Sequence, residues 1–182
     1  MIMNHFEITE LQRTTANLVR IGTIVEADYD HALVRVKIGD LLTNWLSFTT
    51  LRAAKVTLWC PPEVGEQVIV ISPGGNLAQG IVIPAMYQDK FKATDSKSTT
   101  TKLSFADGAK LEYDSEAHHL QATLPGGGKT TLVSEGGITI TGDITVTGQI
   151  ISTGDQVAGG ISQINHTHGG VEAGGSNTAA PH

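Results

Sequence analysis

A six-residue repeat between residues 138 and 155 places the strongest constraint on the fold of this 182-residue chain. From Ile138 to Ile150 the even positions carry Ile, Val or Gly, whereas the odd positions carry Thr, Asp or Gln. This alternation predicts extended backbone with one apolar face and one polar face. Thr-Gly-Asp at 141, Thr-Gly-Gln at 147 and Thr-Gly-Asp at 153 recur every six residues. A short repeat of this kind is typical of a β-helix.

The small number of repeats predicts self-association. A β-helix made by one chain needs several repeats per coil and several coils, whereas this chain has only three repeats. We therefore predict that three copies wind about a common axis as a homotrimer. Burial of an Ile or Val side chain contributes ~1.5–3 kcal/mol, and here that gain is obtained only on assembly. The shared core would comprise Ile138, Ile140, Ile144, Val146 and Ile150 of each chain.

The first half of the chain predicts a small β-barrel. Short apolar runs separated by Pro and Gly suggest five strands within about 65 residues, and a closed barrel suits them better than an open sheet with exposed edges. An OB-like barrel is the simplest arrangement. Before it, the spacing of Ile8, Leu11 and Thr15 predicts a short helix within residues 1–18. The expected strands are Arg20 to Ala27, Ala32 to Ile38, Asn44 to Thr49, Gln67 to Ser72 and Ala78 to Ile83.

A polar stretch that ends near Thr101 predicts a domain boundary, because it offers little to bury. Beyond it we expect further strands at Lys102 to Phe105, Ala109 to Tyr113, His119 to Leu124 and Lys129 to Val133. The predicted fold class is therefore all-β, with an N-terminal OB-fold barrel followed by a trimeric intertwined β-helix. The predicted parts are an N-terminal segment (1–18), the barrel (19–88), a linker (89–101), a β-helical shaft (102–160) and an apex (161–182).

Composition argues against several classes of partner and site. The net charge is −6 without a run of Lys or Arg, so we expect no nucleic-acid partner. Residues 1–10 lack the features of a signal peptide, and no window approaches ~18 apolar residues, so we expect synthesis in the cytoplasm without export by that route. Cys60 is the only cysteine, which rules out a disulfide within the chain. We predict that it is a small buried side chain without a catalytic role.

His166 and His168 are the candidate metal ligands. They lie two residues apart, so in extended backbone both imidazoles project from the same face. Two ligands are too few for a stable site in a monomer, but a threefold axis would bring six nitrogens together in a closed octahedral cage. Such a cage leaves no position for a substrate, so the metal would be structural. Imidazole suits zinc, copper, iron and nickel, and octahedral geometry weakens the case for zinc.

Other motifs do not suggest a site. His118 and His119 are adjacent and face opposite ways on a strand, and we expect both at the surface. Thr123 to Thr130 imitates a phosphate loop but has Thr where the first glycine is required, so we interpret it as a hairpin turn. A hydrolytic metal site would need more ligands, and only Glu172 follows soon after the histidine pair. Asn165-His166-Thr167 matches a glycosylation sequon, without other signs of secretion. We predict no catalytic residue and no small-molecule substrate.

Several stretches together resemble the phage baseplate assembly protein V family, the central spikes of contractile phage tails and R-type pyocins. They include Val19 to Glu26, Gly39 to Leu46, Pro61 to Val68 and Asn76 to Gly80. At the other end, His166-Thr167-His168 and the Gly-rich tail from Gly169 to His182 resemble the apex of the family's spike. One departure is Gly169, where we expect proline in close relatives.

The resemblance implies a barrel that docks on the baseplate hub protein, a trimeric shaft, and an apex where His166 and His168 of three chains hold one iron ion. It further implies assembly into a virion or pyocin tail and a mechanical action on the bacterial outer membrane. Iron follows from the resemblance alone. Two other functions stay open. A trimeric carbohydrate-binding tail fibre or tailspike would normally have exposed aromatic platforms or a carboxylate pair. A hexapeptide-repeat acyltransferase would have more repeats.

Overall fold

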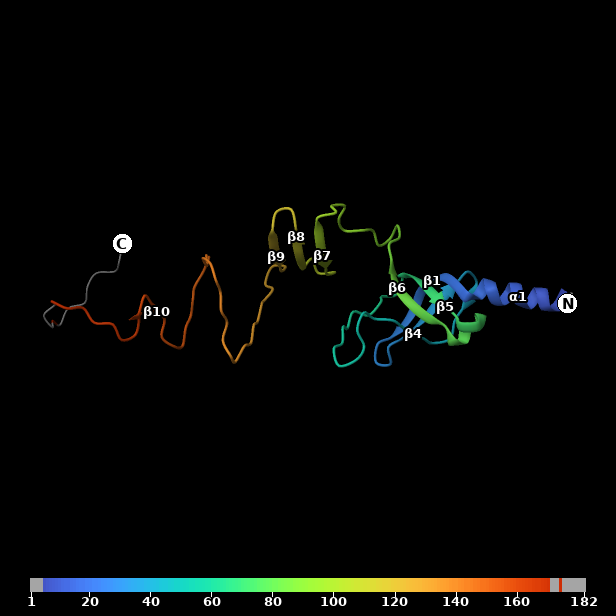
Figure 1. The fold of residues 1–182 in the computed structure, drawn as a ribbon, viewed down its shortest axis with the longest axis horizontal. Coiled ribbons are helices and arrows are strands. Elements are labelled where there is room, and N and C mark those ends of the chain that lie inside the picture. The colour runs from blue at the N-terminus through green and yellow to red at the C-terminus, as the bar shows by residue number, and fades with distance from the viewer. Residues whose placement is uncertain (1–4, 171–173, 175–182) are drawn as a thin grey trace. The chain divides into compact units, whose positions relative to one another are not determined.

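The computed structural model describes residues 5–170 and residue 174. Its elements are a six-stranded sheet, a three-stranded sheet, a two-stranded hairpin and one longer helix (Figure 1). Helix α1 spans His5–Leu18 and leads directly into the first strand, as the spacing of Ile8 and Leu11 predicted. No helix in the described ranges is long and apolar enough to cross a bilayer. The chain separates into two compact units, residues 1–129 and 130–182.

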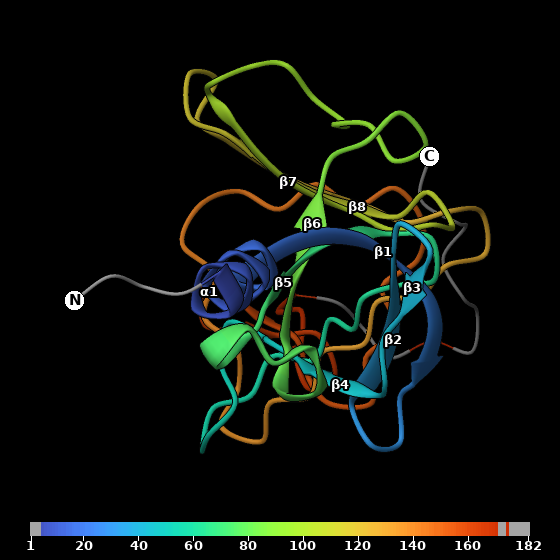
Figure 2. The same cartoon turned by 90° about the vertical axis from the view of Figure 1, so that its right-hand side faces the viewer.

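The barrel is closed by five strands, which confirms the predicted OB-fold architecture. The strands follow the order β1-β5-β6-β4-β2, and β1 also pairs with β2 to close the ring (Figure 2). Strands β4 and β6 are parallel and the other pairs are antiparallel. The short strand β3 adds to β2. The bounds are β1 Val19–Asp28, β2 Leu33–Ile38, β3 Leu41–Leu42, β4 Leu46–Phe48, β5 Gln67–Ile71 and β6 Ile81–Met86.

The core of the barrel follows from the alternation of its strands. In β2 and β5 every second residue is buried, so one face of each strand points inward. A bulge between Ile24 and Glu26 bends β1, which lets one strand pair with both β5 and β2. Gly22 is required there, since a Cβ atom would lie 2.4 Å from Val36 Cγ1. The buried apolar residues of the core are Ile24, Val34, Val36, Ile38, Leu46, Val68, Val70 and Val82.

Two predicted barrel strands differ from the structure by more than one residue at an end. Strand β4 is shorter than Asn44 to Thr49 because Trp45 lies outside the ladder, with its ring 5.9 Å from the Arg35 guanidinium. Strand β6 begins at Ile81 rather than Ala78, because Leu77–Gln79 forms a 3₁₀ turn. The Asn76 side chain caps this turn by accepting a hydrogen bond from the Ala78 N–H.

The prediction for Cys60 was wrong, because this residue is exposed. It lies in the long connection between β4 and β5, which contains only an isolated bridge between Ala53 and Thr57. Most apolar side chains of this connection are exposed as well, including Leu51 and Trp59. The centroid of the Trp59 ring lies 6.2 Å from that of Phe48 at the barrel, whereas the thiol of Cys60 remains in contact with solvent.

A second sheet follows the barrel. Strands β7 (Thr100–Ser104), β8 (Lys110–Asp114) and β9 (His119–Thr123) form an antiparallel meander. This confirms three of the four strands predicted beyond the boundary. The fourth, Lys129 to Val133, was wrong: the structure assigns no strand between β9 and Val157 within one chain. Extended backbone needs a neighbouring edge to be a strand, and one copy provides none here.

The repeat region has the exposure that a single copy of an incomplete β-helix should have. The five residues assigned to a shared core are between 48% and 68% exposed in one chain. Gly142 and Gly148, the glycines of the first two triplets, both have positive φ, which allows the backbone to turn there. The five-part division of the chain remains a prediction, and residues 1–4 and most of the Gly-rich tail lie outside the described residues.

Candidate metal centre

A small hairpin precedes the candidate ligands. Strands β10 (Val157–Ala158) and β11 (Ile161–Ser162) pair in antiparallel fashion, and Figure 1 marks β10 towards the C-terminal end of the chain. The two residues between them are Gly159 and Gly160, with φ of 58° and 84°. A two-residue hairpin turn of type I′ needs positive φ at both positions, which Gly-Gly satisfies without strain. The sequence therefore defines this hairpin locally, without help from a larger sheet.

The hairpin continues directly into the histidine pair. The rings of His166 and His168 lie with their centroids 5.0 Å apart and their planes at 81°. Both residues are exposed in one chain. Spacing predicted that the two imidazoles share a face, and the structure does bring their rings together. Glu172, the other potential ligand, lies outside the described residues.

One hydrogen bond decides which nitrogen of His166 is free. Its Nδ1 lies 2.9 Å from the carbonyl oxygen of Ser162. A carbonyl oxygen only accepts, so Nδ1 donates its proton and Nε2 keeps its lone pair. A neutral imidazole in this tautomer is a competent ligand for a transition metal.

The donor set fits a metal, but only as part of an assembly. Among residues 5–170 and 174 no group of three or more His, Cys, Asp or Glu side chains lies close enough to hold an ion. Two imidazoles per chain would make a complete first shell only if copies met at the histidine pair. The role of His166 and His168 as ligands therefore remains a prediction.

The histidines rejected as ligands lie where the sequence suggested. His118 and His119 are exposed, and His119 begins β9. The segment that imitates a phosphate loop contains a turn, in which Gly128 N–H donates to the Pro125 carbonyl at 2.9 Å. No strand follows this turn within one chain, so it is not the hairpin we expected. No helix begins after it in the described region either, so a helix N-terminus for a phosphate is lacking there.

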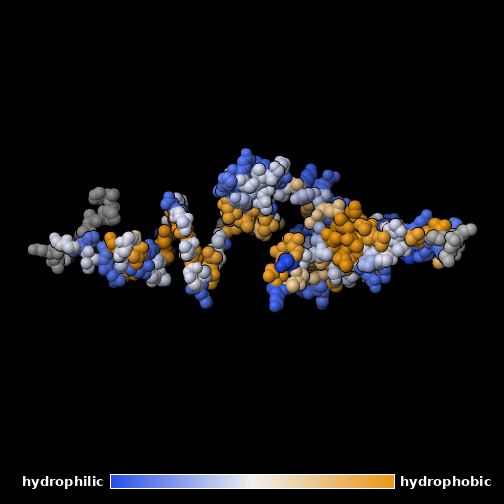
Figure 3. All heavy atoms as spheres, viewed as in Figure 1, coloured by the Kyte–Doolittle hydropathy of each residue, from blue (hydrophilic) through white to orange (hydrophobic). Residues whose placement is uncertain are grey.

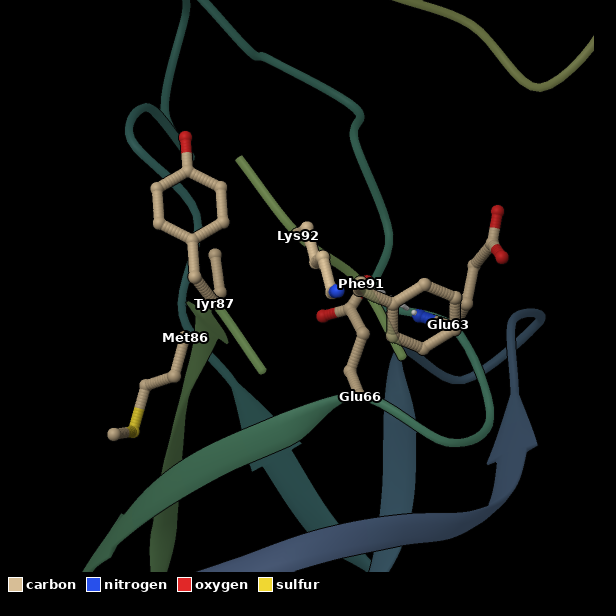
Figure 4. Close-up of a pocket in the computed structure, with 7 residues that line it drawn as sticks. Glu63, Glu66, Met86, Tyr87, Phe91 and Lys92 are labelled. Atoms are coloured by element: carbon tan, nitrogen blue, oxygen red, sulfur yellow. Dashed lines mark hydrogen bonds between the residues drawn. The ribbon is translucent and has the colours of Figure 1, made fainter. Parts of the chain in front are cut away.

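A pocket of about 370 Å³ lies beside the end of β6. It is lined largely by apolar side chains, with carboxylates from Glu63 and Glu66 (Figure 4). The two carboxylates point in different directions in Figure 4, and Glu66 Oε1 accepts a hydrogen bond from the Glu63 N–H at 3.1 Å. A carboxylate pair that works on one bond must converge on it. The pocket does not provide that arrangement. Its other lining residues are Ala85, Met86, Tyr87, Phe91 and Lys92.

Two exposed apolar surfaces were not predicted. On the second sheet, cross-strand pairing places Leu103 opposite Leu111, and Tyr113 opposite Leu120. These four side chains form one exposed apolar face, whereas Lys102, Glu112 and Gln121 occupy the polar face. We call the apolar side the sheet face; the alternation in these strands was the signal for it. Figure 3 shows apolar residues gathered on this sheet.

The other surface, the barrel patch, covers the outside of β1, β5 and β6. Strand register places its residues in two rows of three, Val19-Ile71-Ile81 and Ile21-Ile69-Ile83. Five of the six are between 37% and 59% exposed. Figure 3 shows apolar residues over the strands that Figure 1 labels β1 and β5. Exposed apolar side chains gathered in this way make the barrel patch a candidate contact site.

Comparison with known proteins links the barrel and the hairpin. Residues 20–87 match the family model for the type VI secretion system/phage-baseplate injector OB domain. Residues 160–181 match the model for the GpV apex motif. Over 134 residues the chain is 34% identical to the spike protein of Escherichia phage P2, a stretch that covers 74% of this chain and 63% of that protein. The chain thus spans somewhat less than two thirds of this relative's length.

Proposed function

Because the chain belongs to the phage baseplate spike family, we propose that it is the central membrane-piercing spike of a contractile phage tail or an R-type pyocin. The observation that carries the proposal is the combination of an injector OB domain and an apex motif in one chain, in that order. The similar phage P2 protein is itself a spike protein. The chain would be made in the bacterial cytoplasm and assembled into the baseplate of a virion or pyocin tail.

The working form would be a homotrimer. The sheet face exposes apolar side chains on one side of its strands, and the alternating apolar residues of the repeat region are exposed as well. Three copies would turn these apolar sides toward a common axis and leave the Thr, Asp and Lys sides in water. Backbone groups that lack a partner in one copy, such as those of residues 138–150, would then pair between copies. The result is a rigid shaft held together along its whole length.

The apex would hold one iron ion per trimer, bound by six imidazoles. Two histidines from each of three chains supply six nitrogens, and His166 already presents a free Nε2. Bound there, the ion would supply a permanent cross-link between three chain ends that could otherwise separate. With every coordination position filled by protein, the centre would be structural rather than catalytic.

The proposed action is mechanical. Contraction of the tail sheath would drive the tube forward, and the spike would meet the bacterial outer membrane first as a narrow point. The barrel would dock on the baseplate hub protein and cap the tube, and the barrel patch is the surface we propose for that contact. No bond in a substrate needs to be cleaved, so we propose a structural protein without catalytic residues. A carbohydrate-binding fibre is less well supported, because residues after 114 contain no Phe, Trp or Tyr.

Sedimentation combined with metal analysis tests this function. We expect the full chain to sediment as a trimer with one tightly held transition-metal ion, identified as iron by elemental analysis. Replacing both His166 and His168 by Ala should abolish the metal, whereas the trimer should persist because the shaft core is independent of the apex. As a matched control, His118→Ala with His119→Ala should leave the metal content unchanged. A monomer, or one ion per chain, would contradict the proposal.

A further inference from the structure

The hairpin that precedes the histidine pair contains a hydrogen-bond network that the ligands themselves do not explain. Its centre is Ser162, the last residue of β11. The Ser162 hydroxyl accepts the Asn165 N–H at 2.8 Å, and its carbonyl accepts the His166 Nδ1 proton at 2.9 Å. One residue therefore holds both the backbone that leads to His166 and the ring of His166.

Asp155, which precedes β10, contacts the segment that follows β11. Its Oδ1 accepts the Ile164 N–H at 3.1 Å, nine residues along the chain. Beside it, Gln163 N–H donates to the Gln156 carbonyl at 3.0 Å, which extends the β10–β11 ladder by one step. The pKa of the Asp155 carboxyl lies below its ordinary value, chiefly because of the Ser162 side chain and also because of backbone N–H groups such as that of Ile164. The Asp155 contact with Ile164 and the Ser162 contacts with Asn165 and His166 together hold the segment that leaves the hairpin.

These contacts are unusual for so exposed a segment. Side chains of Ser and Asp in loops ordinarily bond to backbone one to four residues away. The Asp155 contact instead spans nine residues and fixes the chain where it leaves the hairpin. The network ends on Nδ1 of His166, a candidate ligand. It therefore affects which ring nitrogen of His166 carries the proton as well as where the ring lies.

We propose that Asp155 and Ser162 are positioning residues for the metal centre: they hold His166 with its proton on Nδ1 and its Nε2 lone pair available. The inference rests on the proposed function, since it concerns the ligand of the proposed apex. Histidine ligands of metals generally donate their second ring N–H to a carbonyl or carboxylate, which fixes the tautomer and the ring orientation. Here the acceptor is the Ser162 carbonyl, and Asp155 keeps that carbonyl in place.

The first test reads the tautomer without metal. In the metal-free full chain with ¹⁵N-labelled histidine, ring nitrogen shifts should show the proton of His166 on Nδ1. Asp155→Ala and Ser162→Ala should each move His166 toward the other tautomer, while Ser162→Thr, which keeps the hydroxyl, should resemble the unaltered chain. Ser152→Ala is the matched control: Ser152 donates to the Gly154 carbonyl at 2.7 Å, outside the hairpin network.

The second test measures affinity for Fe²⁺ by competition with a chelator. Loss of such outer contacts usually weakens metal binding about 10-fold to 100-fold, and we expect that range for Asp155→Ala and Ser162→Ala. Trimer mass should not change. If the two variants keep both the tautomer and the affinity, the positioning role is wrong. If the unaltered chain binds no metal but carries the His166 proton on Nδ1, the proposed metal centre is wrong. The hairpin would then still be what fixes the tautomer of His166.

Discussion

At the scale of the residue, Thr43 shows how the barrel completes its hydrogen bonds where a strand pair is interrupted. Strand β2 pairs with β3 at Lys37 and Ile38 and with β4 at Leu33 and Val34, which leaves Val36 between the two ladders. Thr43 fills the gap: its Oγ1 accepts the Val36 N–H at 2.9 Å, and its own N–H donates to the Val36 carbonyl at 3.0 Å. Thr43 is buried, so water cannot replace either partner.

We therefore expect Thr43→Val to destabilise the barrel by about 1–3 kcal/mol, since it leaves the Val36 N–H buried without an acceptor. Thr43→Ser keeps the hydroxyl and should cost less, about 0.8 kcal/mol for the lost methyl group. Both Trp45 and Trp59 belong to the barrel part of the chain, so tryptophan fluorescence during urea unfolding reports on the barrel. Equal unfolding free energies for the two variants would show that the hydroxyl does not satisfy the Val36 N–H.

At the scale of the element, an ion cluster fastens the polar linker to the second sheet. Lys102 on β7 is opposite Glu112 on β8, and its Nζ lies 2.6 Å from Asp95 Oδ2 and 3.0 Å from Glu112 Oε2. The Lys102 ammonium, with the Lys97 and Ser96 N–H groups, lowers the pKa of Asp95 from 3.8 to about 2. Asp95 thus favours the folded state wherever it is ionised.

The sign of this effect sets a pH window. A carboxyl whose pKa is lower when folded contributes stability above its unfolded pKa, and that contribution is lost as the pH falls through the folded value. For Asp95 the window runs from about pH 4 down to about pH 2. Calorimetry should show that Asp95→Asn melts at a lower temperature than the unaltered chain near pH 6, with the difference shrinking across this window. If the difference in melting temperature between Asp95→Asn and the unaltered chain stays constant across this window, the charge of Asp95 does not have this role.

What the sequence predicted about these elements depended on how local their causes are. The barrel strands were predictable because their signals are local: buried and exposed residues alternate along a strand, and a turn such as Pro73-Gly74 is indicated by its own residues. Lys129 to Val133 was not, because a strand also needs an edge that one copy lacks. The exposure of Cys60 was not, because nothing in the neighbouring residues indicates that this apolar connection stays largely exposed. At the candidate site, spacing predicted the shared face of His166 and His168, but the tautomer depends on the Ser162 carbonyl, a backbone group that no residue type encodes.

At the scale of the whole molecule, we propose that the exposed apolar surfaces bind two different partners, other copies of this chain and the hub protein. The sheet face and the repeat region continue one another along the chain and would face other copies. The barrel patch lies on the outside of a closed barrel, and none of its residues belongs to the buried core of that barrel. A folded barrel that carries six apolar side chains outside its core is suited to a partner that binds after folding, which is the role proposed for the hub.

Charged substitutions in the barrel patch test this division. Ile21→Lys and Ile71→Lys should each weaken capture of the co-expressed hub protein about tenfold or more, since loss of a central apolar contact commonly costs ~2 kcal/mol or more. Leu41→Lys on β3 is the control, because Leu41 is 44% exposed but lies outside the patch. Barrel unfolding and trimer mass should stay the same in all three variants. If Ile21→Lys and Ile71→Lys instead dissociate the trimer, the patch binds a second copy, and the hub must dock elsewhere on the barrel.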